Sequence, residues 1–423
     1  MEPIFKTPKD GYYFFGYYDK SPFDIFSNKL LAQKASFIDR EPTSDDQLEI
    51  GYFEWKSGGN FIYLTSTKAW NWQQGCMLQW LGPDFNTKII YNDKVDGRFV
   101  SIVMDINTKE KKILPMAVYS MHPEGGAALC IDNERHYWFR EGYNYQGIQN
   151  LSKKLPLDMA DGIWLLNINK KNSEKIIHMA DLLETYPLTN MHEATHYLEH
   201  LMFNPCGTRF SFLHRWKTLD GTIYGRLYTA DINGDNVYLL NDSGRVTHSC
   251  WVNDSDLIAW SGLENPINRL RKYKKFTKYF LKPLLPLYHR FIKQGSKISK
   301  AVTGDSYVRF VDRTNVRERL YSELLTEDGH PSFSATNKVQ MISDTYEDIN
   351  HKRHLFLFNI DTGNKVDIAS LNSSCASDKT TYRCDLHPKW SFDGKFISVD
   401  TTNEGGRQVC IYSNPSVHYK YYK

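Results

Sequence analysis

One short sequence frame recurs along the chain, and this recurrence limits the possible folds more than any other feature. The clearest copy is His387-Pro-Lys-Trp390-Ser-Phe-Asp-Gly394-Lys-Phe-Ile-Ser-Val399. A tight Asp-Gly turn followed by a run of alternating apolar residues is typical of a β-hairpin. Three more copies begin at His200, His248 and His330, and weaker copies begin at Tyr17, Met77 and Tyr119. The copies lie 60, 42, 81, 48, 82 and 57 residues apart, and the shortest interval fits one four-stranded blade of a β-propeller.

A second repeated segment supports this interpretation. Four apolar runs end in Asn or Asp before a polar turn, as expected for the third strand of a blade; they begin at Val100, Ile163, Arg226 and Leu355. Aromatic residues make up 14% of the chain, which also favours β structure. A large β-sandwich is the alternative, but a sandwich does not require one frame to recur seven times. We therefore predict an all-β fold, a single seven-bladed β-propeller domain over residues 1–423.

The long intervals between copies predict two insertions, at residues 131–199 and 264–310. The first contains an Arg- and Tyr-rich stretch at 137–145 and a short helix expected at 179–185. The second contains a strongly basic segment. Long loops on a rigid scaffold are where binding and catalysis concentrate.

Targeting and disulfide signals are both missing from the sequence. Residues 1–15 contain charges and a proline rather than a signal-peptide core, and no segment reaches about eighteen uninterrupted apolar residues. Seven cysteines occur at irregular spacing without a Cys-x-x-Cys pair, which argues against a disulfide framework. We therefore expect a cytoplasmic protein with reduced thiols.

Four histidines share one position of the frame: His200, His248, His330 and His387. In a propeller, residues that open the innermost strands lie near the central axis, so we expect these side chains to form a ring. Converging imidazoles suit zinc, manganese, nickel or iron; a nearby carboxylate, Asp385 or Asp328, favours manganese, whereas Cys250 or Cys384 as a ligand would favour zinc. The alternative for each histidine taken alone is a structural role, as a hydrogen-bonded residue before a strand. Four imidazoles without partners, however, would be costly to bury near the axis. We predict a divalent-metal site, for manganese or zinc, formed by the four histidines and Asp385.

Other residues near the same face are candidates for catalysis and substrate binding. His214 ends the strand after His200, and Arg226 opens the next strand of that blade. A histidine and an arginine placed in this way suit a general base and a carboxylate clamp, and Arg215 lies beside the base. Solvated strand ends are the alternative. For substrate binding we predict aromatic surfaces and one cation, with a core position as the alternative for most of the rings: Trp70, Trp72, Tyr119, Tyr346 and Arg383.

Several of these motifs together resemble the propeller polysaccharide lyases, namely oligogalacturonate lyases and ulvan lyases. They are Trp70-Asn-Trp-Gln-Gln-Gly-Cys-Met-Leu-Gln-Trp80, the frame from His200 to His214, His248 before Trp251, and Asp385-Leu386-His387-Pro388. The resemblance covers most of the chain but is sharp only at these motifs. The chain also resembles propeller proteins of bacterial surface-polysaccharide clusters, some of them labelled glycosyltransferases.

The resemblance to the lyases implies β-elimination on a uronic acid, with His248 and His387 in metal-ligand motifs and His214 as the base. Two departures stand out. The lyases show His-Pro-His-Pro where this chain has Asp385-Leu386-His387-Pro388, and their base follows Phe-Cys and precedes Glu, whereas His214 lies in Phe-Leu-His-Arg. The ligand set is therefore altered, and His200 and His330 are candidate replacement ligands.

We predict from these observations a carbohydrate-active protein, a metal-assisted lyase-like enzyme that acts on acidic oligosaccharide or polysaccharide. The alternative is a non-catalytic propeller that binds glycan or acts as a scaffold. Such a propeller would be a glycosyltransferase-associated protein in surface-polysaccharide biosynthesis at the membrane.

The basic segment, residues 269–300, bears on location. It holds eleven Lys or Arg and no Asp or Glu, and without it the net charge of +3 becomes −8. Cations interleaved with aromatic and aliphatic residues are typical of segments that contact anionic lipid; a solvated helical loop is the alternative. Nucleic acid is not expected as a partner, because no recognition motif accompanies the charge. We expect peripheral contact with the inner membrane face, where lipid-linked glycan is a possible substrate.

Overall fold

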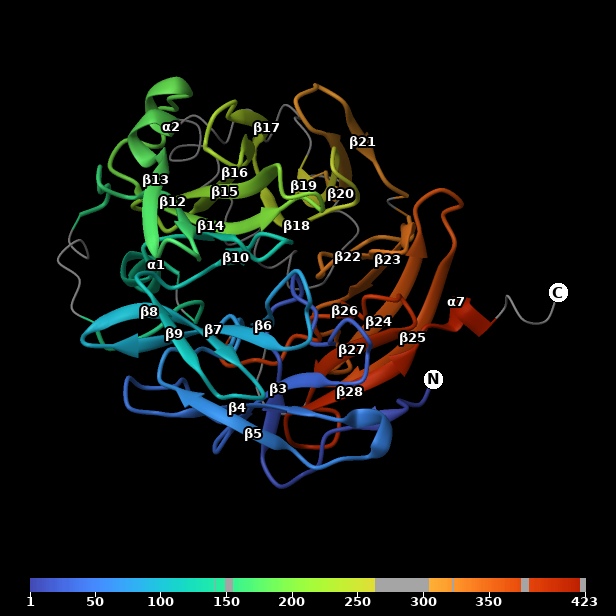
Figure 1. Ribbon diagram of the computed structural model, residues 1–423. Coiled ribbons are helices and arrows are strands. Elements are labelled where there is room, and N and C mark those ends of the chain that lie inside the picture. Colours follow the sequence, from blue (N-terminus) through green and yellow to red (C-terminus); the bar gives the residue numbers. More distant parts are fainter. Residues whose placement is uncertain (141, 149–154, 263–303, 322, 374–379, 419–423) are drawn as a thin grey trace.

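Seven antiparallel sheets of four strands surround a central axis (Figure 1). The computed structural model describes residues 1–423 except 141, 149–154, 263–303, 322, 374–379 and 419–423. Within the described residues the first strands of blades 3 to 7 contact one another in succession around the axis. The predicted seven-bladed β-propeller is confirmed.

The blades are numbered here in chain order, and the strands of each are given from the axis outward. Blade 1 is β2 (Tyr12–Phe14), β3 (Leu30–Ala35), β4 (Leu48–Phe53) and β5 (Ile62–Thr67). Blade 2 is β6 (Gln79–Trp80), β7 (Lys88–Val95), β8 (Arg98–Asp105) and β9 (Lys111–Leu114). Blade 3 is β10 (Ser120–Met121), β11 (Ala127–Cys130), β12 (Gly162–Asn167) and β13 (Asn172–His178).

The remaining blades follow the same plan. Blade 4 is β14 (Thr195–Phe203), β15 (Arg209–Lys217), β16 (Ile223–Asp231) and β17 (Tyr238–Gly244). Blade 5 is β18 (Val246–Trp251), β19 (Asp256–Gly262), β20 (Asp305–Val311) and β21 (Arg317–Arg319). Blade 6 is β22 (Ser332–Ser334), β23 (Asn337–Asp344), β24 (Lys352–Asn359) and β25 (Lys365–Asn372). Blade 7 is β26 (Lys389–Trp390), β27 (Phe396–Thr401), β28 (Gln408–Ser413) and β1 (Phe5–Lys6).

The last blade joins the two ends of the chain. Strand β1 pairs antiparallel with β28, with Phe5 opposite Ile411 and Lys6 opposite Cys410. The first strand of the chain is therefore the outermost strand of blade 7. The sequence frame did not predict this closure, because the frame marks where innermost strands begin and carries no information on the origin of an outer strand.

The second repeated segment forms the third strand of its blade in all four cases: β8, β12, β16 and β24. The Asp-Gly turn of the clearest frame copy also forms as expected. Gly394 has a φ of 69°, a left-handed conformation that glycine adopts without steric cost.

In the part of the chain that the structure describes, the helices are short and lie outside the blades. They are η1 (Trp55–Ser57), α1 (Asn133–Phe139), α2 (Met179–Thr185) and α7 (Pro415–His418). Helix α2 coincides with the helix expected from the sequence. Among the described residues no helix is long and apolar enough to cross a membrane, and their six cysteines are all free.

Both expected insertions are narrower in the structure than in the sequence interpretation. The range 131–199 also contains β12 and β13, so the segments outside the strands of blade 3 and β14 are 131–161 and 179–194. The range 264–310 ends within β20. Its basic segment, residues 269–300, lies outside the described residues.

Candidate metal centre

Four histidines meet at the central axis. The ring centroids are 5.7 Å apart for His200 and His248, 4.4 Å for His248 and His330, and 4.3 Å for His330 and His387. All four side chains are buried. The structure therefore brings together the four histidines that share one position of the sequence frame.

Local irregularities of the innermost strands place these side chains. The pairing of β14 with β15 shifts between Glu199 and Met202, and the pairing of β18 with β19 shifts between Val246 and Ser249. His200 and His248 lie within these shifts, and His200 has a φ of 55°. An extra residue in one strand redirects its side chain, and such bulges are common beside active sites. Each bulge therefore interrupts the alternation of the strand at the histidine.

Asp344 fixes the orientation of His330. Nδ1 of His330 lies 2.9 Å and 3.0 Å from the two carboxylate oxygens of Asp344, at the end of β23. The same carboxylate accepts hydrogen bonds from the main-chain N–H groups of His330 (2.7 Å) and His387 (3.2 Å). A carboxylate at Nδ1 keeps a proton on that nitrogen and leaves Nε2 as the nitrogen that could bind a metal ion. Despite burial, the Asp344 charge raises the pKa of His330, so a bound ion would take the place of a proton on Nε2 at low pH.

Two imidazole nitrogens at the axis are buried without a hydrogen-bond partner. Among the described residues, Nε2 of His330 and Nε2 of His387 are buried and make no hydrogen bond. Burial is the largest cause that holds the pKa of His387 well below its usual range. A neutral imidazole is the form that binds a metal ion. The two unsatisfied nitrogens therefore fit a divalent cation.

His248 has the same arrangement one blade earlier. Its Nδ1 lies 3.1 Å from Oδ1 of Asp328, and the Thr247 hydroxyl donates to the other oxygen of that carboxylate (2.8 Å). The carboxylate again favours a proton on Nδ1. Three successive blades thus each supply one candidate imidazole ligand. A carboxylate lies at Nδ1 of His248 and of His330, and Nε2 of His330 and of His387 has no hydrogen-bond partner.

His200 differs from the other three because protein groups face both of its ring nitrogens. Nε2 forms a short hydrogen bond with the Tyr17 hydroxyl, and Nδ1 lies 3.4 Å from Oε1 of Glu199. The Tyr119 hydroxyl accepts a hydrogen bond from the main-chain N–H of His200 (2.9 Å). The geometry makes Tyr119 a support for His200 rather than a surface for sugar.

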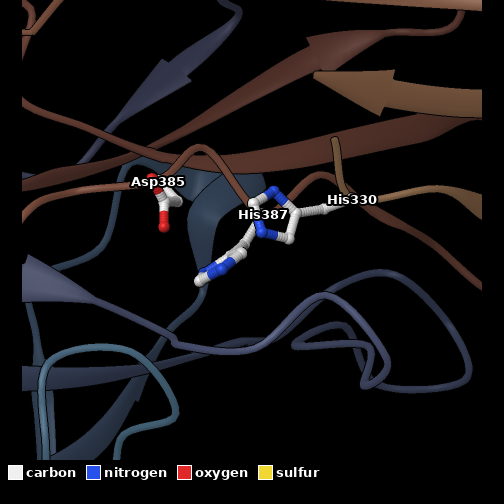
Figure 2. Close-up of side chains that lie close together, drawn as sticks. All are labelled: His330, Asp385 and His387. Carbon is white, nitrogen blue, oxygen red and sulfur yellow. The ribbon is translucent and has the colours of Figure 1, made fainter. Parts of the chain in front are cut away.

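Asp385 lies close to the histidines but also forms ion pairs with two arginines. One carboxylate oxygen of Asp385, one ring nitrogen of His330 and one ring nitrogen of His387 lie within 4.8 Å of one another. Figure 2 shows the three side chains. However, Nη1 of Arg353 lies 2.8 Å from Oδ1, and Nε of Arg383 lies 2.9 Å from Oδ2. Two guanidinium groups, of which that of Arg353 is buried, thus compete with any cation for this carboxylate.

A cavity of about 360 Å³ opens beside the histidines at the start of the innermost strands. His200, His248 and Tyr346 lie in its wall, and the Tyr346 ring is 5.8 Å from the His330 ring. The wall also contains three arginines and two aspartates: Arg140, Arg215, Arg245, Asp305 and Asp328.

The charges around this cavity are paired. Behind the wall the buried Glu199 carboxylate forms a short ion pair with Arg215 and lies 3.3 Å from Nε of Arg140. At the mouth, Nε of Arg245 donates to Asp305 (2.8 Å). Arg140 and Arg215 thus share one carboxylate, which leaves this part of the wall with an excess of one positive charge.

The structure places the expected base and clamp outside this cavity. His214 and Arg226 lie opposite each other on β15 and β16, and both are buried. Nε2 of His214 lies 3.0 Å from Nδ1 of His196, and Nη1 of Arg226 donates to the Tyr186 carbonyl (2.7 Å). Successive residues of a strand face opposite sides, so Arg215 reaches the cavity and His214 does not.

Two of the expected aromatic surfaces are core residues. Trp70 and Trp72 pack against each other and against Phe14, and their indole N–H groups donate to the main-chain carbonyls of Asp46 and Arg40. Arg383 is close to the site but occupied, because it contacts Asp385 and donates to the Tyr143 hydroxyl (3.0 Å). Of the five predicted substrate-binding residues, Tyr346 is the one in the cavity wall.

Three further residues of the site were not predicted from the sequence. Glu199 directly precedes His200, and Tyr17 opens the first copy of the frame. The repeated frame could therefore have pointed to both residues. Asp344 ends β23 and reaches His330 only because β22 and β23 are neighbours in the sheet. No sequence spacing marks that contact.

Comparison with known proteins supports the fold. No protein-family model matches the chain, and no curated protein sequence matches it. An oligogalacturonate lyase in complex with manganese has a TM-score of 0.64 and 16% identity, with 98% of this chain and 93% of that chain covered. An oligogalacturonate lyase from Vibrio parahaemolyticus has a TM-score of 0.60 and 13% identity, with 97% and 93% covered. At these identities the likeness establishes the shared propeller fold.

Proposed function

We propose that this protein is a metal-assisted lyase that cleaves uronic-acid oligosaccharide or polysaccharide by β-elimination. The observation that carries the proposal is the pair of buried, unsatisfied Nε2 atoms of His330 and His387 beside an arginine-lined cavity. The manganese complex of an oligogalacturonate lyase with the same fold supports it.

The residues suited to hold the ion are His248, His330 and His387. A bound divalent cation would supply the charge that neutralises a uronate carboxylate, and this neutralisation makes the proton at C5 acidic enough to remove. Imidazole donors suit manganese or zinc. Asp328 and Asp344 orient two of the three rings through Nδ1.

The chain's own groups would bind and orient the sugar. Arg140 and Arg215 in the cavity wall can share their guanidinium groups between Glu199 and a substrate carboxylate. The reaction transfers the C5 proton to a base, forms the C4–C5 double bond and breaks the bond from C4 to the glycosidic oxygen, which takes up a proton. Because His214 lies outside the cavity, the base would come from the wall, where His200 is the candidate. Burial lowers its pKa to about 4, which keeps the imidazole neutral, whereas burial raises the pKa of Tyr197 and of Tyr346 and keeps both hydroxyls protonated.

Absorbance of unsaturated uronate tests the proposal. Purified protein with manganese is incubated with a panel of uronic-acid oligosaccharides, and absorbance is expected to rise with at least one of them. His330→Ala should abolish the rise, and His351→Ala should not, because the His351 side chain is 79% exposed and remote from the axis residues. Absence of signal on a broad panel, with metal bound, would contradict the proposal.

A non-catalytic role is the second candidate, and two observations favour it. The lyase-like motif has Asp385 bound to two arginines in place of a histidine, and the expected base is buried away from the cavity. The protein would then bind glycan or dock a glycosyltransferase in surface-polysaccharide biosynthesis. Calorimetric binding of acidic oligosaccharide without a change in absorbance is the expected result in that case.

The basic segment supports a proposal about location. Residues 269–300 carry eleven cations, each worth about 1 kcal/mol near an anionic leaflet. We propose a cytoplasmic protein bound peripherally to the inner membrane face, where lipid-linked glycan would be the substrate. Flotation with anionic liposomes should recover the full chain but not a form without residues 269–300, and equal recovery of both forms would rule out this role.

A further inference from the structure

The cavity beside the histidines extends outward from the axis. Its inner end contains His200 and His248, on the first strands of blades 4 and 5. Its outer wall contains Ile223 and Asp305, which begin the third strands of the same blades, β16 and β20. Neighbouring strands of a sheet lie about 4.8 Å apart, so the cavity covers two such spacings. A ligand that fills it is therefore longer than one sugar ring.

The inner part of the cavity offers one unbalanced positive charge. Arg140 and Arg215 lie in the wall and share the carboxylate of Glu199. The Glu199 side chain is only 1% exposed, whereas the side chains of Arg140 and Arg215 are 30% and 11% exposed. The surface that this group presents is therefore cationic, and it lies beside His200. One carboxylate of a ligand fits here.

The outer part of the cavity offers no unbalanced charge. Nε of Arg245 donates to Oδ1 of Asp305 at 2.8 Å, and Nη2 donates to Oδ2 in a second, short contact. This bidentate pair balances the charge of the guanidinium group. The Asp305 side chain is 10% exposed, so a ligand carboxylate placed here would approach a carboxylate of the protein. Like charges repel, and a second carboxylate on the ligand is therefore disfavoured.

The same outer wall suits an uncharged sugar. A guanidinium group has more N–H donors than the two that Arg245 uses on Asp305, and the carboxylate oxygens retain lone pairs for hydroxyl groups. Trp260 lies in the wall two positions before the β19 partner of Asp305, and it is half-buried. Its ring packs against the Tyr307 ring at 5.2 Å. An indole surface of this kind suits the apolar face of a sugar ring.

We propose that the cavity selects a uronic acid whose neighbour in the oligosaccharide is a neutral sugar. The uronate carboxylate lies at Arg140 and Arg215, and the neutral ring lies against Trp260 and the pair of Arg245 and Asp305. This selectivity rests on the proposed function, which supplies the uronic acid. It makes a chain of uronic acids alone a poor ligand.

Matched disaccharides test the selectivity. The two members of a pair share one uronic acid and differ in the second ring, which is a hexose in one member and the corresponding hexuronic acid in the other. Pairs of gluco and galacto configuration are both used. Stopped-flow tryptophan fluorescence of the manganese-loaded full chain measures binding before any elimination. In at least one pair the uronate-hexose member should bind about tenfold or more tightly, because it lacks the carboxylate that Asp305 repels.

Asp305→Asn tests the cause of this preference. The variant removes the opposing charge and frees Arg245 for a second carboxylate, so the uronate-uronate member should bind at least as tightly as the uronate-hexose member. Asp256→Asn is the matched control. Asp256 forms an ion pair with Arg309 (2.9 Å) in the same blade, outside the cavity wall, and its loss should leave the preference unchanged.

Three results would overturn the inference: equal or tighter binding of the uronate-uronate member by the native protein, no binding of any pair, or an unchanged preference in folded Asp305→Asn. If Asp305→Asn does not fold, the preference of the native protein still decides. The absorbance assay on longer oligosaccharides tests the lyase reaction separately. Preference for the uronate-hexose member without elimination would contradict the lyase and keep the selectivity, whereas elimination with tighter binding of the uronate-uronate member would do the opposite.

Discussion

At the scale of single residues, Asp344 has the largest influence on the metal centre. Its carboxylate holds the ring and the main chain of His330 and the main chain of His387. A carboxylate in this position orients a ligand and keeps its coordinating nitrogen unprotonated. Loss of that carboxylate should therefore affect metal binding without removing a ligand.

We predict that Asp344→Asn weakens manganese binding by roughly 10- to 100-fold, measured by isothermal titration calorimetry. Asp348→Asn is the matched control, because Asp348 forms a comparable contact with His354 (3.0 Å) at the surface. An unchanged affinity in Asp344→Asn would show that His330 is not a ligand.

A second residue-scale prediction concerns the buried pair of His196 and His214. Burial lowers the pKa of His196 to about 4, and burial together with the charge of His196 lowers the pKa of His214 further below its usual range. The unfolded chain then binds more protons than the folded chain below a pH of about 6.5. Stability is therefore complete above that pH and is lost as the pH falls toward 4.

The expected loss for His196 alone is about 2 kcal/mol between pH 7 and pH 5. Urea unfolding at both pH values measures it. His196→Gln should unfold with a smaller difference between the two pH values than the native protein. An equal difference in both forms would place the pH dependence in other groups.

The site was only partly predictable at this scale. The four histidines share a frame position, so their convergence followed once the repeat was recognised. His214 and Arg215 were both expected at the site, although neighbours in a strand face opposite sides. Asp344 of β23 and Arg353 of β24 reach the site through strand registers that a single sequence does not reveal. Arg383 was expected at the site as a substrate-binding cation, but it contacts Asp385 instead.

At the scale of secondary-structure elements, the pairing of β1 with β28 closes the ring. The repeat identified innermost strands and third strands because both carry apolar runs with polar turns. Strand β1 has only two residues, Phe5 and Lys6, too few for any alternation to be recognised. The bulges that direct His200 and His248 were also invisible, because a bulge depends on the partner strand.

We predict that Phe5→Ala destabilises the protein by about 2 kcal/mol, as expected for loss of a half-buried aromatic ring. The Phe5 ring packs at 5.7 Å against Phe53 and at 6.3 Å against Trp55 of blade 1. Urea unfolding measures the change, with Lys9→Ala as the control because Lys9 is 66% exposed. Equal stability of both variants would show that β1 contributes little to closure.

At the scale of the whole molecule, the candidate metal ligands come from three blades. His248, His330 and His387 come from blades 5, 6 and 7, so a bound ion would link elements that otherwise contact only their neighbours. A ligand that binds only the folded state stabilises it by about 2.7 kcal/mol at a hundred times its dissociation constant.

We predict that manganese raises the midpoint of thermal unfolding of the native protein and that chelation reverses the rise. Differential scanning calorimetry should show no such rise for a His248→Ala, His387→Ala variant. A rise of the same size in both proteins would mean that manganese binds elsewhere.

The position of β1 has a consequence for synthesis on the ribosome. Blades 1 to 6 can form one after another as the chain emerges, but β1 must wait until residue 411 has been made before it finds its partner. During that time β1 is unpaired, and His387 has not yet joined the other three histidines at the axis. The site is therefore complete only after blade 7 has been synthesised, and a nascent chain stalled before blade 7 would hold neither a closed ring nor the full set of imidazoles.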